Sequence, residues 1–248
     1  MKPKVSVIIP VYNGARFISC ALDSVIIQDV PSEIIVIDDN SSDNIEEVLT
    51  PYLQRSEIRL LKNNVNVGAA ESRNRGVRAA QGEYVAFLDC DDWWEPDKLK
   101  KQLALMKKSG CVLCSTGRRL VTPDGRKTKR IICVKQTLSY NSMLVQNPIN
   151  CSSVLLKRDV ALEFPMSHDE YHEDYITWLR ILRKYRRACA IDEPLLNYRI
   201  SSSGKSGNKL QSAGMTFHVY RCMGFSWPKS IVCFIAYTLN GVRKYARW

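Results

Sequence analysis

The chain has 248 residues, of which 45% are hydrophobic and 25% are charged, with a formal net charge of +11. This is the composition of an ordinary globular protein, and it excludes collagen-like, low-complexity and mainly disordered chains. No run of 18 or more uncharged apolar residues occurs, so we expect no membrane-spanning helix. The apolar run at 5–11 is also too short for the core of a signal peptide.

The positive charge is concentrated at the end of the chain. Glu193 is the last acidic residue, and the final 55 residues carry only basic charges. These are Arg199, Lys205, Lys209, Arg221, Lys229, Arg243, Lys244 and Arg247. Such a segment indicates an anionic partner, for which nucleic acid, substrate phosphates and acidic lipid headgroups are all candidates.

The nine cysteines are odd in number and scattered, which favours reduced thiols in a cytoplasmic protein. Cys111 and Cys114 have C-x-x-C spacing but lack the second pair or the histidines of a zinc site. We expect them in a core strand.

Strands and helices alternate in the first half of the sequence. Apolar β-branched runs predict strands at 5–9, 33–37, 58–61 and 84–88. Helical spacing and helix start signals predict helices at 17–28, 45–54, 69–80 and 96–108. This order predicts an α/β fold with a mostly parallel central sheet flanked by helices. Ligands bind such sheets beyond the carboxyl ends of the strands.

Carboxylates stand at two of these strand ends, as Asp38-Asp39 and as Asp89-Cys90-Asp91-Asp92. The sequence has no G-x-G-x-x-G after the first strand, no P-loop and no G-x-S-x-G elbow. Crowded carboxylates raise one another's pKa unless a cation neutralises them, so a Mg²⁺ or Mn²⁺ ion sharing phosphate oxygens is the natural occupant. The alternative is that these aspartates only cap the following helix.

Four segments carry a family resemblance: 5–13 (VSVIIPVYN), 36–43 (VIDDNSSD), 66–76 (NVGAAESRNRG) and 87–93 (FLDCDDW). In this order and spacing the chain resembles the family 2 glycosyltransferases from about residue 4 to 199. The resemblance implies a GT-A fold and inverting transfer of a sugar from a nucleotide donor, with a UDP-sugar as the preferred donor, to a glycan acceptor. It further implies a catalytic domain at 1–200, with a nucleotide-sugar half at about 1–110 and an acceptor half at about 111–200. A flexible loop and a basic amphipathic helical extension would follow at 201–248.

The resemblance implies a role for each carboxylate of the first two clusters. Asp91 would act in catalysis as the metal ligand at the donor diphosphate. Asp89 would share the metal or lie by the ribose or sugar, and Asp92 would lie near the sugar or cap a helix. Asp39 would accept a hydrogen bond from the nucleobase of the donor. Asp38 would support Asp39 or serve only as a turn residue.

Other positions follow from the same resemblance. Pro10, Tyr12 and Asn13 would line the nucleotide pocket. Arg73 would lie near the diphosphate, although a solvated arginine on a helix is the alternative.

The segment 171–178 (YHEDYITW) is similar to the Glu-Asp motif of the family. Asp174 would be the general base that deprotonates the acceptor, and Glu173 would orient the acceptor or the base. The same residues could instead only stabilise the start of a helix. Tyr198-Arg199 leads into a Gly/Ser-rich loop without the histidine found in many relatives, so Arg199 and Lys205 would take over contacts with the phosphates.

An apolar helix with a basic end is expected at 227–248. Three placements stay open: on an anionic membrane surface, packed on the catalytic domain, or in a homodimer. The first would make a cytoplasmic protein peripheral to the inner face of the membrane and suit a lipid-linked acceptor of surface polysaccharide synthesis.

The sequence disfavours three other functions. A nucleic-acid-binding protein is disfavoured because no groove-reading motif is present. A non-catalytic sugar-nucleotide-binding subunit is disfavoured by the intact Asp89, Asp91 and Asp174. A sugar-1-phosphate nucleotidyltransferase would need a Gly-rich, Arg-containing first loop, which is missing.

Overall fold

The computed structural model describes residues 3–167, 169–200 and 209–246. Its strands are β1 (Val5–Val11), β2 (Ser32–Asp38), β3 (Arg59–Lys62), β4 (Tyr84–Phe87), β5 (Trp93–Trp94), β6 (Leu113–Val121), β7 (Lys127–Ile132), β8 (Thr137–Ser139), β9 (Leu155–Lys157) and β10 (Arg187–Arg199). Its helices are α1 (Ile18–Ile26), α2 (Ile45–Gln54), α3 (Gly68–Ala79), α4 (Lys98–Ser109), α5 (Tyr140–Val145), the 3₁₀ turn η1 (Cys151–Ser153), α6 (Arg158–Glu163), α7 (Glu173–Tyr185), α8 (Lys209–Cys222) and α9 (Trp227–Ala246).

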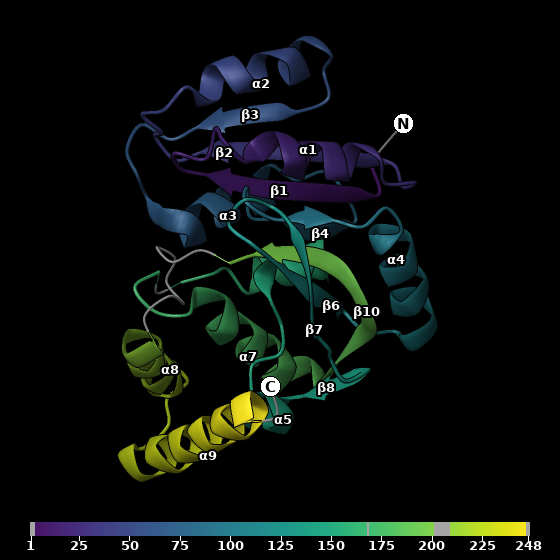
Figure 1. Ribbon diagram of the computed structural model, residues 1–248. Coiled ribbons are helices and arrows are strands. Elements are labelled where there is room, and N and C mark those ends of the chain that lie inside the picture. The colour runs from purple at the N-terminus through teal and green to yellow at the C-terminus, as the bar shows by residue number, and fades with distance from the viewer. Residues whose placement is uncertain (1–2, 168, 201–208, 247–248) are drawn as a thin grey trace.

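One sheet runs through the molecule in the order β3-β2-β1-β4-β9-β6-β10-β5 (Figure 1). The strands β3, β2, β1 and β4 are parallel, as the alternating pattern predicts. Beyond them β9 lies antiparallel between β4 and β6, and β10 returns parallel to β6. The sheet is therefore parallel in the first half of the chain and mixed in the second.

Alternating side chains of the buried strands enter two different cores. In β1, Val7 and Ile9 face the core under α1, α2 and α4, whereas Ile8 faces the core under α3 and α7. This period of two explains why the strand is apolar throughout, because helices cover both of its faces. Gly76 lets α3 approach closely, since an added Cβ would lie 2.5 Å from Ile8 Cγ2.

The cysteines behave as buried or exposed thiols. All nine are free. Cys114 is buried in β6, as expected for a core strand, whereas Cys111 is buried just before that strand begins at Leu113.

The C-terminal helix α9 packs against α5 and α8 and lies at the end of the molecule opposite to α2 (Figure 1). Within the described residues, no helix combines the length and the hydropathy needed to cross a bilayer.

Candidate active site

The loops after β1 and β2 are fastened to each other. Asn13 has a left-handed backbone, with φ of 52°, and its amide N–H donates to Ser41 Oγ at 3.0 Å. Its side-chain oxygen accepts from the Ser42 amide at 2.8 Å. Asp38 is buried, and its carboxylate accepts from the Ser41 amide at 2.9 Å, as expected for a turn residue. Tyr12, which precedes Asn13 in the same loop, is 54% exposed, so a planar ligand could stack on its ring. Pro10 is half-buried at the end of β1.

Asp39 anchors the segment that leads into α3. Its carboxylate is 3% exposed and accepts from Asn63 Nδ2 at 2.7 Å and from the amides of Val67 and Gly68 at 2.9 Å each. A carboxylate offers about four acceptor positions, so three contacts leave room for one more donor. This geometry is compatible with a hydrogen bond from a nucleobase to Asp39, whose carboxylate would then bind both the nucleobase and the loop.

The aspartates after β4 repel one another. Burial, followed by the charge of Asp89, raises the pKa of Asp91 to about 6. Burial together with Asp91 and Asp89 also raises the pKa of Asp92 well above its usual range. Asp92 is 1% exposed and accepts from the Arg199 amide at 2.9 Å, so its contact is with the protein backbone.

Asp91 is a candidate ligand for a divalent ion that would take its remaining ligands from a substrate, whereas Asp89, also expected to bind the ion, is paired through Oδ1 with Arg73 at 2.6 Å. No described residue forms an ion pair with Asp91. The described part of the chain also contains no group of three or more His, Cys, Asp or Glu residues that could hold a metal on its own. Mg²⁺ and Mn²⁺ are suited to such a site, because Mg²⁺ is usually bound by one or two carboxylates plus phosphate oxygens and water.

Arg73 joins the two halves of the site. Its side chain is 6% exposed and donates to Asp89 Oδ1 at 2.6 Å and to Glu173 Oε1 at 2.8 Å. The alternative that Arg73 is a solvated arginine on a helix is therefore wrong. Glu173 is 7% exposed, and its carboxylate faces Arg73. This geometry favours a positioning role for Glu173.

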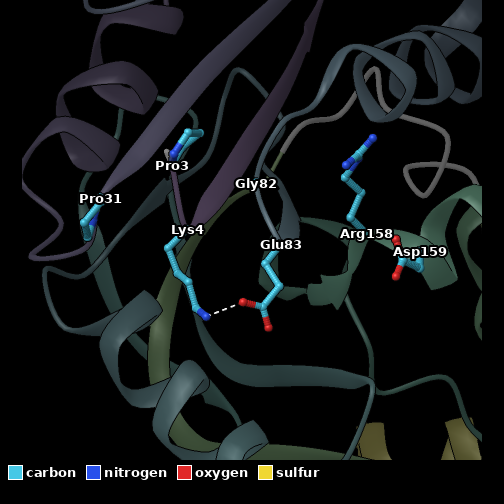
Figure 2. A pocket seen from close by; sticks show the side chains of 7 residues that line it. All are labelled: Pro3, Lys4, Pro31, Gly82, Glu83, Arg158 and Asp159. Atoms are coloured by element: carbon cyan, nitrogen blue, oxygen red, sulfur yellow. Dashed lines mark hydrogen bonds and ion pairs between the residues drawn. The ribbon is translucent and has the colours of Figure 1, made fainter. Parts of the chain in front are cut away.

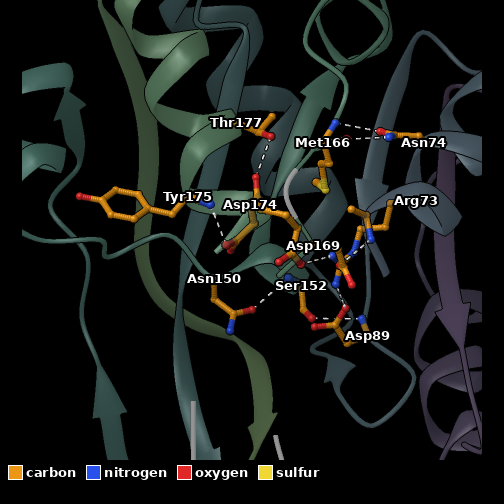
Figure 3. Close-up of polar contacts among 12 residues, drawn as sticks. Arg73, Asn74, Asp89, Asn150, Ser152, Met166, Asp169, Asp174, Tyr175 and Thr177 are labelled. Carbon is orange, nitrogen blue, oxygen red and sulfur yellow. Dashed lines mark hydrogen bonds and ion pairs between the residues drawn. The ribbon is translucent and has the colours of Figure 1, made fainter. Parts of the chain in front are cut away.

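Asp174 lies in the first turn of α7, in the region where Arg73, Asp89 and Ser152 also lie (Figure 3). Its Oδ1 accepts from the Tyr175 amide at 2.7 Å. Burial, and next the charge of Glu173, raises the pKa of Asp174 to about 7. A carboxylate with this pKa can take and release a proton near neutral pH, as a general base must.

Arg199 is buried behind the aspartates. It donates from Nε to the Asp91 carbonyl and from Nη1 to the Pro123 carbonyl, both at 2.9 Å. Its guanidinium also lies over the rings of Phe17 and Trp93, 4.7 and 5.2 Å from their centroids. These contacts hold the Asp91 turn in place, so we interpret Arg199 as a support for that turn. Lys205, the other residue expected on the phosphates, lies outside the described residues.

Sequence reasoning missed two residues that position the site. Ser152 Oγ accepts from the Asp89 amide at 3.1 Å, and the Ser152 carbonyl accepts from Trp94 Nε1 at 2.8 Å. Asp169 accepts from the Ala70 amide at 3.1 Å, at the start of α3. The only sequence signal is a short polar run before a buried strand in the first case and an isolated aspartate in the second.

A cavity of about 640 Å³ lies elsewhere, at the amino ends of β1 and β4 (Figure 2). It is lined by Pro3, Lys4, Pro31, Gly82, Glu83, Arg158 and Asp159. None of the expected site residues that the structure describes lines it, and sheets of this kind bind ligands at the other, carboxyl edge.

The architecture and the aspartates at the carboxyl edge define an enzyme of the GT-A class. Sequence comparison then gives the family: the model for glycosyl transferase family 2 matches residues 6–161, and the chain belongs to this family. The resemblance inferred from the four motifs is thus confirmed.

Two relatives match over nearly their whole length. The chain is 37% identical over 246 residues to TuaG of Bacillus subtilis (strain 168), and 98% of each chain is covered. The name of TuaG describes a glycosyltransferase of teichuronic acid biosynthesis. It is 32% identical over 247 residues to the UDP-Glc:alpha-D-GlcNAc-diphosphoundecaprenol beta-1,3-glucosyltransferase WfgD of Escherichia coli, covering 98% of this chain and 95% of WfgD.

Solved structures confirm the fold. S. aureus TarS 1–349 in complex with UDP-GlcNAc superposes with a TM-score of 0.73 at 17% identity, covering 95% of this chain and 71% of that one. The mannosyltransferase PcManGT from Pyrobaculum calidifontis, in complex with GDP-Man and Mn²⁺, gives a TM-score of 0.71 at 20% identity, with coverage of 95% and 69%.

Proposed function

We propose that this glycosyltransferase transfers a sugar, with inversion, from a UDP-sugar to a lipid-linked glycan acceptor in surface polysaccharide synthesis. The observation that carries the proposal is the arrangement around Arg73. This one buried guanidinium joins Asp89, beside the donor carboxylates, to Glu173, the neighbour of the candidate base Asp174. The names of WfgD and TuaG support the donor, the lipid-linked acceptor and the polysaccharide.

The two halves of the chain have separate tasks in this proposal. Residues 1–110 bind the donor, with Asn13 and Asp39 shaping the nucleotide site and Asp89 and Asp91 holding a divalent ion. That ion, when bound, stabilises the negative charge of the departing diphosphate. Residues 111–200 present the acceptor to Asp174.

The chemistry assigned to Asp174 is a single proton transfer. The acceptor oxygen forms a bond to the anomeric carbon while the bond from that carbon to the diphosphate breaks, and UDP leaves with the electron pair. The acceptor proton passes to Asp174, which must be ionised beforehand. Attack from the face opposite the leaving group inverts the anomeric configuration.

A thermal-shift panel of nucleotide sugars tests the proposal. A ligand that binds only the folded state raises the melting temperature, so UDP-sugars should do so in the presence of Mn²⁺ and GDP- or dTDP-sugars should not. Transfer to a GlcNAc-diphosphate-lipid should then yield a β-linked product. Donor binding without transfer to any such acceptor would favour the non-catalytic subunit, and no response to UDP-sugars would exclude the proposed donor.

A further inference from the structure

One face of α9 is used for packing on the domain. Cys233, Phe234 and Tyr237 pack against the core, with Phe234 edge-on to Phe217 at 5.8 Å between ring centroids. Asn240 also donates to the Val145 carbonyl at the end of α5, at 3.3 Å. The expectation of a helix packed on the catalytic domain is therefore correct for this face.

The opposite face of the same helix is also apolar but remains exposed. Its side chains recur at helical spacing over four turns and are 47–66% exposed. They are Trp227, Ile231, Val232, Ile235, Leu239 and Val242, of which Trp227 also contacts Phe217 at 5.7 Å between ring centroids. Single exposed apolar residues are ordinary, but a continuous stripe of this kind marks an interaction surface. We call these six residues the outward stripe.

The charged residues of α8 and α9 are all basic. Arg221 lies over the ring of Trp227, 4.8 Å from its centroid. Lys229, on the first turn of α9, lies instead over the ring of Phe225, 4.0 Å from its centroid. Away from the stripe, a cavity of about 410 Å³ between α6, α7 and the end of α8 has three basic side chains in its lining, but Lys184 there is paired with Glu163. No acidic residue follows Glu193 in the sequence.

This combination selects the occupant. A second copy docked through α9 would bring two segments of the same positive sign together, since a twofold interface pairs a surface with itself. Anionic lipid headgroups complement the basic residues, while the acyl boundary accepts the apolar side chains.

We propose that the outward stripe docks on an anionic membrane surface and thereby brings the acceptor side of the active site to the lipid. This inference rests on the proposed function, because it assigns a location to its lipid-linked acceptor. The ring of Tyr237, on the inward face of α9, lies 6.1 Å from that of Tyr175, the neighbour of Asp174. A helix with its side chains is about 10–12 Å wide, so the bilayer surface lies about one helix diameter from the element that carries the candidate base.

Vesicle co-sedimentation of the full chain tests the inference. The test variant combines Val232→Gln, Ile235→Gln and Leu239→Gln, which remove apolar surface without changing charge. The matched control combines Ile26→Gln, Ile27→Gln and Leu53→Gln. These residues are also exposed, and they lie at the end of α1 and on α2, away from α9 (Figure 1).

We expect the wild type and the control to bind phosphatidylglycerol-containing vesicles, with weaker binding at high salt and to phosphatidylcholine alone. The affinity of the α9 variant for these vesicles should be lower by at least about tenfold, since three inserted apolar side chains are lost. Its transfer to a vesicle-embedded acceptor should fall in parallel, while transfer to a short soluble acceptor and UDP-sugar binding should match the control.

Two outcomes would overturn the docking surface. One is vesicle binding by the α9 variant equal to that of the control. The other is that light scattering shows a dimer for the wild type and a monomer for the α9 variant, with equal vesicle binding by the two proteins. If none of the three proteins bound UDP-sugars but their vesicle binding followed the expected pattern, the proposed function would be rejected and the docking surface would still be supported.

Discussion

At the scale of single residues, the carboxylates of the site are held in a state that costs folding free energy. Burial and mutual repulsion raise the pKa of Asp91 to about 6 and that of Asp174 to about 7. The ordinary value for an aspartate is about 3.9. Protonation therefore stabilises the folded state, and this contribution is present below pH ~4 and is lost as the pH rises through the folded-state values. At neutral pH the protein keeps reactive carboxylates at the expense of stability.

Asp174→Asn separates catalysis from stability. We expect turnover to fall by about 10²–10⁴-fold, the usual span for loss of a general base, with little change in donor affinity. In the wild type, activity should decline as the pH falls through about 7, because the base becomes protonated. The variant should melt at a higher temperature than the wild type at pH 8 but not at pH 4, since Asn carries no charge to bury. Donor titration by calorimetry is the control measurement, and collapse of donor binding would assign Asp174 to the nucleotide site.

Asp91→Asn tests the metal. The substitution keeps the volume but removes one of two carboxylates available to a divalent ion, so Mn²⁺-dependent UDP binding should weaken by at least about tenfold. Asp97→Asn is a suitable control, because the Asp97 side chain is 68% exposed at the start of α4 and outside the site. The measurement is calorimetric titration with UDP with and without Mn²⁺. Equal metal-dependent affinity in Asp91→Asn and wild type would reject Asp91 as a ligand.

At the scale of elements, the sequence predicts local structure well and strand partners poorly. The first four strands and their helices lie within a few residues of the expected bounds, because apolar periodicity and helix signals are local. The antiparallel insertion of β9 between β4 and β6 does not follow from the sequence pattern. It pairs Leu156 with Val85 and Leu113, residues far away in the chain, and a short apolar run does not specify such partners.

The segment before α3 depends on a glycine. Gly68 has φ of +86°, and an added Cβ would lie 2.5 Å from Asp169 Oδ2. Gly68→Ala should therefore lower the free energy of unfolding by roughly 2 kcal/mol and weaken UDP binding, because the same amide donates to Asp39. Gly214→Ala is the matched control: nothing lies within 4 Å of its added Cβ in α8, so stability should stay equal or rise. Urea unfolding of both variants checks this, and equal stabilities would show that the segment yields without cost.

At the scale of the whole molecule, the motifs predict where the site lies but not the contacts that assemble it. Asp39, Asp89 and Asp91 follow strands, so the rule that ligands bind at the carboxyl edge predicts their location from the sequence alone. The contact of Arg73 with Glu173 spans 100 positions, and the contact of Asp89 with Ser152 spans 63. Such pairs depend on how β9 and α7 pack against the first half, which no local pattern in one sequence reveals.

The two faces of α9 predict different results for deletion and for surface substitution. Deleting 227–248 removes Phe234 and Tyr237 from Phe217 and Tyr175, and it exposes the core beneath α5 and α8. We expect the free energy of unfolding to fall by about 2–4 kcal/mol, from the loss of two partly buried aromatic side chains.

The nucleotide half should survive this deletion, because the core under α1, α2 and α4 contains none of the described side chains of α9. UDP binding should therefore persist below the lowered melting temperature, whereas the Gln variant of Val232, Ile235 and Leu239 should unfold at the wild-type temperature. Differential scanning calorimetry of the three proteins, with and without UDP and Mn²⁺, makes the comparison. A truncated chain as stable as the wild type would show that α9 adds nothing to the fold and that its inward contacts are dispensable. A Gln variant as unstable as the truncation would show that the outward stripe is packed rather than free to meet a membrane.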